Sequence, residues 1–302
     1  MRKKTTSPEK QTKALSPAVA TERFSLADVL IYVFLGLIVL TILIPFANIV
    51  ALSLSDYSSA IADKTMLFPG GFNLKAYSIM FNEEFYRSFL LTLVVTVANT
   101  ALHLILCMMA AYPLSHANLP GRKVMLFFIL FAMLFNGGTI PFYMLIRDLN
   151  LTDNILVYIL PGVVAPFTVI LMKNFINQIP KSLEEAALMD GANYAQVLFK
   201  IIFPLSKPIM ATMGLFNAVG VWNNWFSAIL FVKDKKLYLI QNVLRELIIK
   251  DNLGAMGQAS ESSAEISIQM AAIVITILPI LLLYAFLQRY FMKGITLGSV
   301  KE

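Results

Sequence analysis

Six apolar stretches, each long enough to cross a membrane as a helix, constrain the fold of this chain most strongly. The hydrocarbon core of a bilayer is about 30 Å thick, so a helix needs roughly 20 mostly apolar residues to span it. Charged residues make up 14% of the chain, whereas a soluble domain carries about 25%. We therefore predict an all-α, polytopic integral membrane protein with six transmembrane helices. The predicted spans are approximately 29–51, 88–111, 123–146, 155–175, 207–232 and 269–291.

The segment before the first span, 1–28, is polar and basic. We do not expect a cleaved signal peptide, because the polar part is too long and the apolar run after it is a full span. We predict a disordered cytoplasmic tail beside anionic lipid headgroups. A nucleic-acid-binding arm is the alternative interpretation, and we expect no nucleic-acid partner.

Charge counting favours an orientation with both termini in the cytoplasm. The inner segments are then 1–28, 112–123, 173–207 and 289–302. They hold 15 basic and 7 acidic residues, whereas the remaining segments hold 9 basic and 11 acidic residues. Because basic residues concentrate on the cytoplasmic side of membrane proteins, the polar segment between the fourth and fifth spans is also predicted to be cytoplasmic.

That polar segment, residues 181–205, is here named the insert, and it is predicted to form two short helices. Ser182 with Glu185 three residues later has the pattern of a capping box at a helix start. Gly191 is placed to end this first helix. A helix of about two turns is marginal in isolation, so we expect another structure to hold it.

The second helix of the insert is predicted to begin at Asn193, with Gln196 at the third helical position, and to end at Pro204. Ala186 and Ala187 give the first helix little bulk, which favours a close approach to a partner. A helix lying on the headgroups is the alternative interpretation, but the first helix lacks the lysines and large aromatic residues typical of such helices. We therefore predict a protein-docking helix.

The spacing of residues in the insert resembles a known motif. Glu185-Ala186-Ala187, three residues, Gly191, nine residues and then Ile201-x-Phe203-Pro204 is similar to the EAA motif, EAA-x3-G-x9-I-x-L-P, of the membrane subunits of bacterial ABC importers. Phe203 in place of Leu is the one departure and keeps the apolar character.

The resemblance covers nearly the whole chain after the basic tail, and is strongest to the second permease subunit of maltose-type carbohydrate importers. The branch that imports pectin- or alginate-derived fragments is the most similar. Supporting matches are Phe68-Pro69, Asn73, Tyr77, Trp222-Asn223 and the ending Lys293-Gly294 with Gly298-Ser299-Val300-Lys301.

The resemblance implies a bacterial cytoplasmic membrane complex of two permeases, two ABC ATPase subunits and an extracellular solute-binding protein. It implies that the first helix of the insert is a coupling helix seated on an ATPase, where Glu185 pairs with a basic residue, caps its own helix, or does both. The coupling residues would be Glu184, Glu185, Ala186, Ala187, Asp190, Gly191, Ile201 and Pro204. The tail 293–302 would touch the ATPases through Gly294, Gly298, Val300 and Lys301. The outer loop 233–268 lies where the family has a loop that reaches the binding protein.

The chain contains no G-x-x-x-x-G-K-[ST] sequence, which is the phosphate-binding loop of many ATPases. We expect a transport subunit rather than an enzyme, with no cofactor of its own and with ATP and Mg in the partner ATPases. No cysteine or histidine cluster has the spacing of a metal site. His103 and His116 have no carboxylate nearby in the sequence, so we expect packed or headgroup-level side chains. Cys107 is expected to be a small packing residue.

Polar neutral residues interrupt several spans and are candidates for the transport pathway. Amide and aromatic side chains suit a hydroxyl-rich solute, but the same residues also serve as contacts between helices or, for Trp, as interfacial anchors. The candidates are Asn99, Asn136, Asn217, Trp222, Asn223 and Asn224.

Two other classes of function compete with an importer subunit. A secondary carrier usually shows internal repeats and commonly buried charges, and we find neither in the spans. A membrane enzyme needs a catalytic constellation, and none is visible. Within the importer class, a polyol or a glycerol phosphodiester is the alternative cargo to a sugar or oligosaccharide.

Overall fold

The computed structural model describes the chain apart from residues 1–25, 57–58, 60–62, 64, 255–261 and 300–302. Most of the expected basic tail, together with Val300 and Lys301, lies outside the described residues. The described part is almost entirely helical, with one isolated β-bridge between Ser55 and Phe72. This confirms the all-α part of the predicted fold class for the described residues. The chain divides into two compact units, one ending at Phe46 and the other beginning at Ala47.

The first unit contains most of helix α1, which runs Leu26–Ser53. Residues 29–45 of this helix are all exposed, although nearly all of them are apolar. A helix that is apolar on every face is typical of a segment surrounded by lipid. The first predicted span therefore coincides with a single continuous helix.

The second unit is built around α4, which runs Glu83–Ser115. Asn82 caps its start by accepting a hydrogen bond from the backbone N–H of Phe85 at 2.9 Å, and two acidic residues in the first turn complement the helix dipole. Buried positions recur every three or four residues along α4, which gives it one long inward face. That face includes Val95, Asn99, His103, Cys107 and Ala111.

The other elements of this unit follow α4 or precede it by a few residues. They are α3 (Lys75–Met80), α5 (Arg122–Leu134), α6 (Thr139–Asp148), η1 (Ile155–Tyr158), α7 (Pro166–Ile176), α8 (Lys181–Met189), α9 (Tyr194–Val197), η2 (Leu198–Ile202), α10 (Phe203–Leu205), α11 (Lys207–Trp222), α12 (Phe226–Phe231), η3 (Lys235–Leu237), α13 (Ile240–Gly254) and α14 (Ser262–Ser299).

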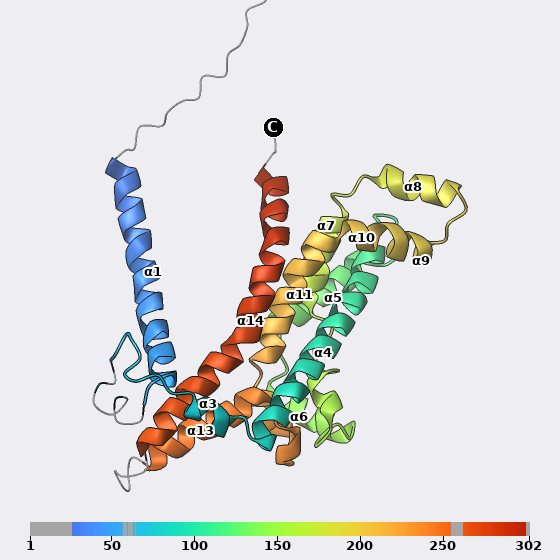
Figure 1. Ribbon diagram of the computed structural model, residues 1–302. Helices are drawn as coiled ribbons and strands as arrows, with labels where there is room; N and C mark the ends of the chain where they lie inside the picture. Colours follow the sequence, from blue (N-terminus) through green and yellow to red (C-terminus); the bar gives the residue numbers. More distant parts are fainter. Residues whose placement is uncertain (1–25, 57–58, 60–62, 64, 255–261, 300–302) are drawn as a thin grey trace, which may run out of the picture. The chain divides into compact units, whose positions relative to one another are not determined.

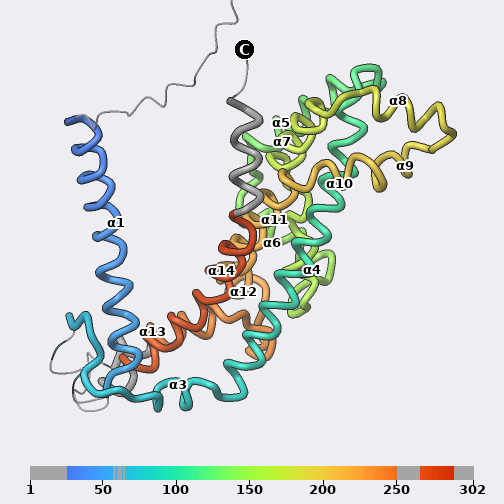
Figure 2. The backbone as a smooth tube through the Cα atoms, turned by 45° about the horizontal axis from the view of Figure 1, so that its top comes forward, coloured from blue at the N-terminus to red at the C-terminus, as the bar shows by residue number. Residues whose placement is uncertain are grey.

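Helices α4, α7 and α11 share a buried apolar core, and α14 packs on α11. A Cβ on Gly214 of α11 would lie 3.2 Å from Cδ1 of Leu104 on α4, so the two helices approach closely at this point. The indole Nε1 of Trp222 donates to the carbonyl oxygen of Thr276 at 3.0 Å, which joins α11 to α14. Figures 1 and 2 show α8 and α9 at one end of the unit and α3 and α13 at the opposite end.

At the end that carries α13, two loops far apart in the sequence meet. The carboxylate of Asp153 accepts hydrogen bonds from the backbone N–H groups of Lys233 and Asp234. These bonds favour the ionised carboxylate and hold the pKa of Asp153 below its ordinary value. Both loops were predicted to lie on one side of the membrane, and the structure places them together.

Three predicted spans are not continuous helices. The third predicted span, 123–146, is split into α5 and α6, whose axes differ by 112°. Gly138 has a positive φ of 91° at the break, and the side chain of Asn136 accepts the N–H of Gly138 at 2.9 Å. Glycine permits this backbone conformation. The side chain of Asn136 supplies a hydrogen-bond acceptor for an N–H group that the interrupted helix leaves without one.

The fourth predicted span, 155–175, is half irregular, because η1 covers only four residues and α7 begins at Pro166. Gly162 has a φ of 70°, and the ring of Pro161 disfavours a helical conformation at the residue before it. The freed carbonyl groups are bound by α4, since Asn99 donates to the oxygen of Ile159 at 2.9 Å and Nδ1 of His103 lies 2.7 Å from the oxygen of Val163. His103 is therefore a packed histidine, as predicted.

The fifth predicted span, 207–232, is interrupted between α11 and α12. The side chain of Asn224, just before α12, accepts the N–H of Ser227 in the first turn of that helix at 3.1 Å. By length and composition, three helices of the described residues are able to cross a membrane, or up to five if each bent pair forms one span. The three are α1, α4 and the part of α14 from Ile266 to Gln288.

Candidate coupling site

The insert contains a helix–turn–helix at one end of the second unit (Figure 1). Helix α8 ends in the geometry predicted for Gly191, whose φ is 83°. The N–H of Gly191 donates to the oxygen of Leu188 at 3.1 Å, and the N–H of Ala192 donates to the oxygen of Ala187 at 3.0 Å. This pair of bonds is a Schellman motif, which satisfies carbonyl groups that the helix end leaves free.

The predicted capping box at the start of α8 is wrong. The helix begins at Lys181, directly after Pro180, so Ser182 lies inside the first turn and no side chain caps the helix. The fixed φ of proline already suits a helix start, and its carbonyl accepts the N–H of Leu183 at 3.2 Å. Glu185 is therefore not a capping residue.

The second helix of the insert has the predicted capping box. The side chain of Asn193 accepts the N–H of Gln196 at 2.9 Å, and the side chain of Gln196 accepts the N–H of Asn193 at 2.9 Å. The helical path continues beyond the expected end, through the π-helical turn η2 to Leu205. Pro204 has no N–H for the carbonyl four residues earlier, which favours the wider π turn. The chain then bends by 79° into α11.

Helix α8 has two chemically different faces. Glu184, Ala187 and Leu188 are partly buried against the rest of the unit. On the other side, Met189 is 88% exposed, and Glu185 is exposed without a hydrogen bond or ion pair to any of the described residues. The two neighbouring glutamates thus have different surroundings. Of the other motif residues, Ala186, Asp190 and Gly191 are exposed, whereas Ile201 and Pro204 lie in the second helical part.

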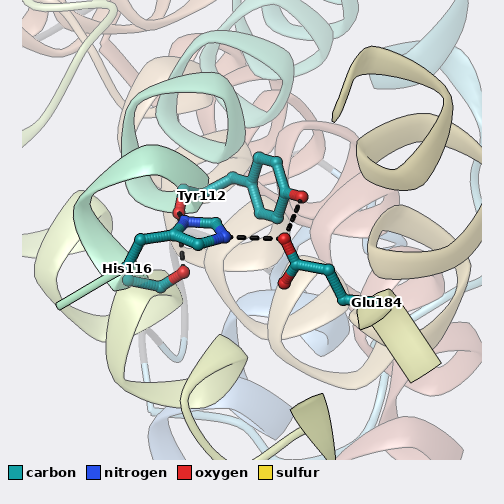
Figure 3. Close-up of polar contacts among 4 residues, drawn as sticks. Tyr112, His116 and Glu184 are labelled. Carbon is teal, nitrogen blue, oxygen red and sulfur yellow. Dashed lines mark hydrogen bonds and ion pairs between the residues drawn. The ribbon is translucent and has the colours of Figure 1, made fainter. Parts of the chain in front are cut away.

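The carboxylate of Glu184 connects α8 to the end of α4 (Figure 3). Its Oε1 atom accepts a hydrogen bond from the hydroxyl of Tyr112 at 2.8 Å and lies 2.7 Å from Nε2 of His116. The other ring nitrogen of His116, Nδ1, lies 3.0 Å from the backbone oxygen of Tyr112. The side chain of Glu184 is 17% exposed and that of His116 is 33% exposed. We name Tyr112, His116 and Glu184 the α4–α8 joint.

The expectation that His116 has no carboxylate partner is wrong. Glu184 is 68 residues away in the sequence, so inspection of the local sequence could not find the pair. Tyr112 and His116 are four residues apart at the end of α4, and their rings form an edge-to-face contact with centroids 4.9 Å apart. The joint lines a cavity of about 740 Å³ that also includes Tyr194 and Lys181.

Two of the predicted pathway residues form a polar contact between helices. The side chain of Asn217 on α11 donates to the side-chain oxygen of Asn99 on α4 at 2.8 Å. The amide of Asn99 donates in turn to the backbone oxygens of Tyr158 and Ile159. Asn99 therefore joins α4, α11 and the irregular segment before α7. These bonds agree with the interpretation of both residues as contacts between helices, and they do not test a contact with solute.

The remaining pathway candidates are dispersed. Trp222 is buried and lines an apolar cavity of about 480 Å³ between α4, α11 and α14. Asn223 is exposed and its side-chain oxygen accepts a bond from Gln241 at 3.2 Å, while Asn136 and Asn224 stabilise helix breaks. The structure does not gather the five asparagines into one site. The tail candidates Gly294 and Gly298 lie in the last turns of α14.

Comparison with known proteins places the chain among transport proteins. The model of the family described as "Binding-protein-dependent transport system inner membrane component" matches residues 104–297. The chain is 40% identical over 282 residues to the polygalacturonan/rhamnogalacturonan transport system permease protein YtcP of Bacillus subtilis (strain 168), covering 91% of this chain and 98% of that protein. It is 30% identical over 267 residues to the melibiose/raffinose/stachyose import permease protein MelC of the same strain, covering 85% and 91%.

A solved structure is also similar. One chain in the crystal structure of a bacterial ABC transporter involved in the import of the acidic polysaccharide alginate is 33% identical, with a TM-score of 0.81. The match covers 90% of this chain and 100% of that chain. The similarity therefore extends well beyond the residues matched by the family model.

Proposed function

The chain belongs to the family of binding-protein-dependent transport system inner membrane components, and from this premise we propose that it is the permease subunit of an ATP-driven importer of oligosaccharides. It would form half of the translocation pathway beside a second, paralogous permease. An extracellular solute-binding protein would deliver the cargo. We propose an orientation in the membrane in which both termini and α8 face the cytoplasm, as the distribution of basic residues favours.

The observation that carries this proposal is the position of α8. A helix of nine residues is marginal by itself, yet it is fixed to α4 on one face and exposes Glu185, Ala186 and Met189 on the other. An exposed methionine beside small residues suits a close contact with a protein partner. We propose that this face seats in an ABC ATPase subunit and that Glu185 pairs with a basic residue there.

Energy for transport would come from the partner subunits. ATP and Mg would bind to two ABC ATPases, and this chain would hold neither. Closure of the ATPase pair would move α8 and, through it, the helices around the pathway. Such a cycle requires that ATP bind the two conformations with different affinities. The last residues of the chain, including Gly294 and Gly298, are proposed as a second contact with the ATPases.

Fragments of acidic polysaccharides are the favoured cargo. The relatives named for polygalacturonan and rhamnogalacturonan and for the acidic polysaccharide alginate are 40% and 33% identical, and the one named for melibiose, raffinose and stachyose is 30% identical. We propose that Asn99, Asn136, Asn217, Trp222, Asn223 and Asn224 line or support the pathway. The loop 233–268 is proposed to contact the binding protein.

Uptake into proteoliposomes tests this proposal. The importer would be reconstituted with its ATPases and binding protein, and uptake of labelled oligogalacturonate, alginate oligosaccharide and raffinose would be compared. We expect uptake of an acidic oligosaccharide that needs both ATP and the binding protein. Uptake that persists without an ATPase would contradict an ATP-driven importer, and preference for raffinose would contradict the cargo alone.

A further inference from the structure

Two side chains at the break between α11 and α12 contact α13. The guanidinium carbon of Arg245 lies 4.0 Å from the centroid of the Trp225 ring, which is the geometry of a cation–π contact. The amide of Gln241 donates to the side-chain oxygen of Asn223 at 3.2 Å. Gln241 and Arg245 are four residues apart on α13 and therefore lie on the same face of that helix. We name Asn223, Trp225, Gln241 and Arg245 the α13 cluster.

The backbone beneath the α13 cluster is fixed, while its side chains are accessible. The side chain of Asn242, which is 3% exposed, donates to the backbone oxygen of Trp225 at 2.8 Å. The ring of Phe226 contacts the Trp225 ring edge-to-face, with centroids 5.6 Å apart. Trp225 is nevertheless 40% exposed, and Arg245 is also exposed. A rigid support under accessible polar side chains is the arrangement that a binding site requires.

Arg245 has hydrogen-bonding capacity that this chain does not use. A guanidinium group carries five N–H donors in one plane, and the contact with Trp225 occupies its face rather than its edge. Within the part of the chain that the structure describes, Arg245 makes no hydrogen bond or ion pair. The adjacent carboxylate of Glu246 is bonded instead to Nζ of Lys235, at 2.9 and 3.0 Å. The edge of the guanidinium therefore suits an external carboxylate, which it can bind through two parallel hydrogen bonds.

The two amides of the cluster add groups that suit a sugar. Among the described residues, Nδ2 of Asn223 and Oε1 of Gln241 have no hydrogen-bond partner. The pair thus offers an N–H donor and an oxygen acceptor near the cation, and a hydroxyl group can both donate and accept. A ligand with a carboxylate and several hydroxyl groups, such as a uronic acid residue, matches this combination.

We propose that the α13 cluster binds a sugar residue of an acidic oligosaccharide through its carboxylate and hydroxyl groups, and that Arg245 selects for the negative charge. This rests on the proposed function and narrows it. The cluster connects the break in the fifth predicted span to the loop 233–268, so the cargo would meet it between the binding protein and the pathway. The segments outside the predicted cytoplasmic ones hold 9 basic and 11 acidic residues. Their overall charge does not attract an anion, and a local cation has to do so.

The test compares two cargoes of equal length and different charge, trigalacturonate and its full methyl ester, in proteoliposomes that contain the complete importer. The measured quantity is kcat/KM of uptake for the loaded binding protein. For Arg245→Gln we expect a fall of about tenfold with trigalacturonate, because a hydrogen bond to a charged group is lost, and a change of less than about twofold with the ester. Arg245→Lys keeps the charge but not the two-bond geometry, so its value should be intermediate. An alginate trisaccharide and its methyl ester form a second pair.

Two further variants show whether the position of the charge matters. Lys75→Gln removes an exposed positive charge from α3, at the same end of the unit as α13 (Figure 1), and should leave the uptake of both cargoes unchanged. Trp225→Phe keeps an aromatic face for the guanidinium and should retain most of the uptake of trigalacturonate. Trp225→Leu removes that face and should reduce this uptake nearly as much as Arg245→Gln.

The competing ligand for Arg245 is an acidic side chain of the binding protein, and the paired cargoes separate the two. Equal losses for both cargoes in Arg245→Gln would assign Arg245 to that protein contact and overturn the sugar site, as would unchanged uptake of both. If the binding protein does not hold the ester, stimulation of ATP hydrolysis by the empty binding protein replaces it. An unchanged stimulation in Arg245→Gln supports the sugar site, and a tenfold loss overturns it. Absence of ATP-dependent uptake of any oligosaccharide by wild type would overturn the proposed function instead.

Discussion

Glu184 and Glu185 are consecutive residues of α8 that line the same cavity, yet only the carboxylate of Glu184 is hydrogen-bonded within the described part of the chain. Glu184 is 17% exposed and bonded to Tyr112 and His116. Glu185 is exposed, with no hydrogen bond or ion pair to any of the residues that the structure describes. One glutamate therefore fixes the helix to its own chain, and the other is available to a partner.

Glu185→Ala is expected to uncouple the importer without unfolding this chain. Loss of one partner of a hydrogen-bonded charge pair at an interface costs about 2 kcal/mol or more, so stimulation of ATP hydrolysis by the loaded binding protein should fall about tenfold or more. Thermal stability of the purified permease should be unchanged, because Glu185 is exposed and makes no hydrogen bond or ion pair within the described residues. Steady-state ATP hydrolysis and a thermal unfolding curve measure the two effects. Unchanged stimulation would remove Glu185 from the contact with the ATPase.

Alanine at Ser182 and at Asn193 should have unequal effects on stability. Ser182 makes no capping bond, so Ser182→Ala should change the unfolding free energy by less than about 0.5 kcal/mol. Asn193→Ala removes a capping box and should cost about 1 kcal/mol. The two variants are matched controls, since both replace a small polar residue in the insert. Equal losses of thermal stability would restore Ser182 as a cap.

These residues show how much of the structure of the insert could be predicted from the sequence. The capping box at Asn193 and the turn at Gly191 depend on local bonds, and local sequence patterns predicted both. Ser182 fitted a similar pattern, but the helix begins at Lys181, directly after Pro180, two residues earlier than a cap at Ser182 would place it. The bond from Glu184 to His116 spans 68 residues, and no spacing rule encodes such a contact.

In the spans, too, local features could be predicted from the sequence and contacts between distant residues could not. Hydropathy predicted α1, α4 and α14, because each is one long apolar helix. It could not distinguish a continuous helix from two apolar pieces, since broken and unbroken segments have the same composition. Asn136 and Asn224 were visible as polar interruptions of the spans. Only the structure shows that Asn99 and His103 bind the carbonyl groups freed at one of these breaks.

The Asn99–Asn217 contact predicts a coupled loss of stability. Asn99→Leu leaves the carbonyl groups of Tyr158 and Ile159 without their donor and should cost about 1–2 kcal/mol. Asn217→Leu should cost less in the Asn99→Leu background than in wild type, because its main partner is already absent. Thermal unfolding of the four proteins of the cycle measures this difference. Additive effects, with a raised KM for uptake, would favour contact with solute over contact between helices.

Asp153 lies at the end of the second unit opposite to α8, and its hydrogen bonds lead us to predict that the stability of the protein depends on pH. Hydrogen bonds from the N–H groups of Lys233 and Asp234 lower its pKa in the folded chain. The stabilisation is therefore present above the pKa of the unfolded chain and is lost as pH falls through the lower, folded value. Asp153→Asn retains an oxygen acceptor and tolerates the φ of 54° at this position.

Wild type should accordingly be more stable than Asp153→Asn at neutral pH, and the difference should shrink in acid below about pH 4. Melting temperatures of both proteins across that range check the prediction. A difference that is constant with pH would show that ionisation of Asp153 contributes nothing.

The central claim, that the exposed face of α8 docks on an ATPase, is tested most directly by photo-cross-linking in the assembled importer. A photoreactive amino acid would be introduced at Met189, which is 88% exposed, or at Leu188, which is partly buried against the same chain. The account predicts a covalent adduct with the ATPase from position 189 and little or none from position 188. Equal adducts from both positions, or no adduct with an ATPase from position 189, would contradict it.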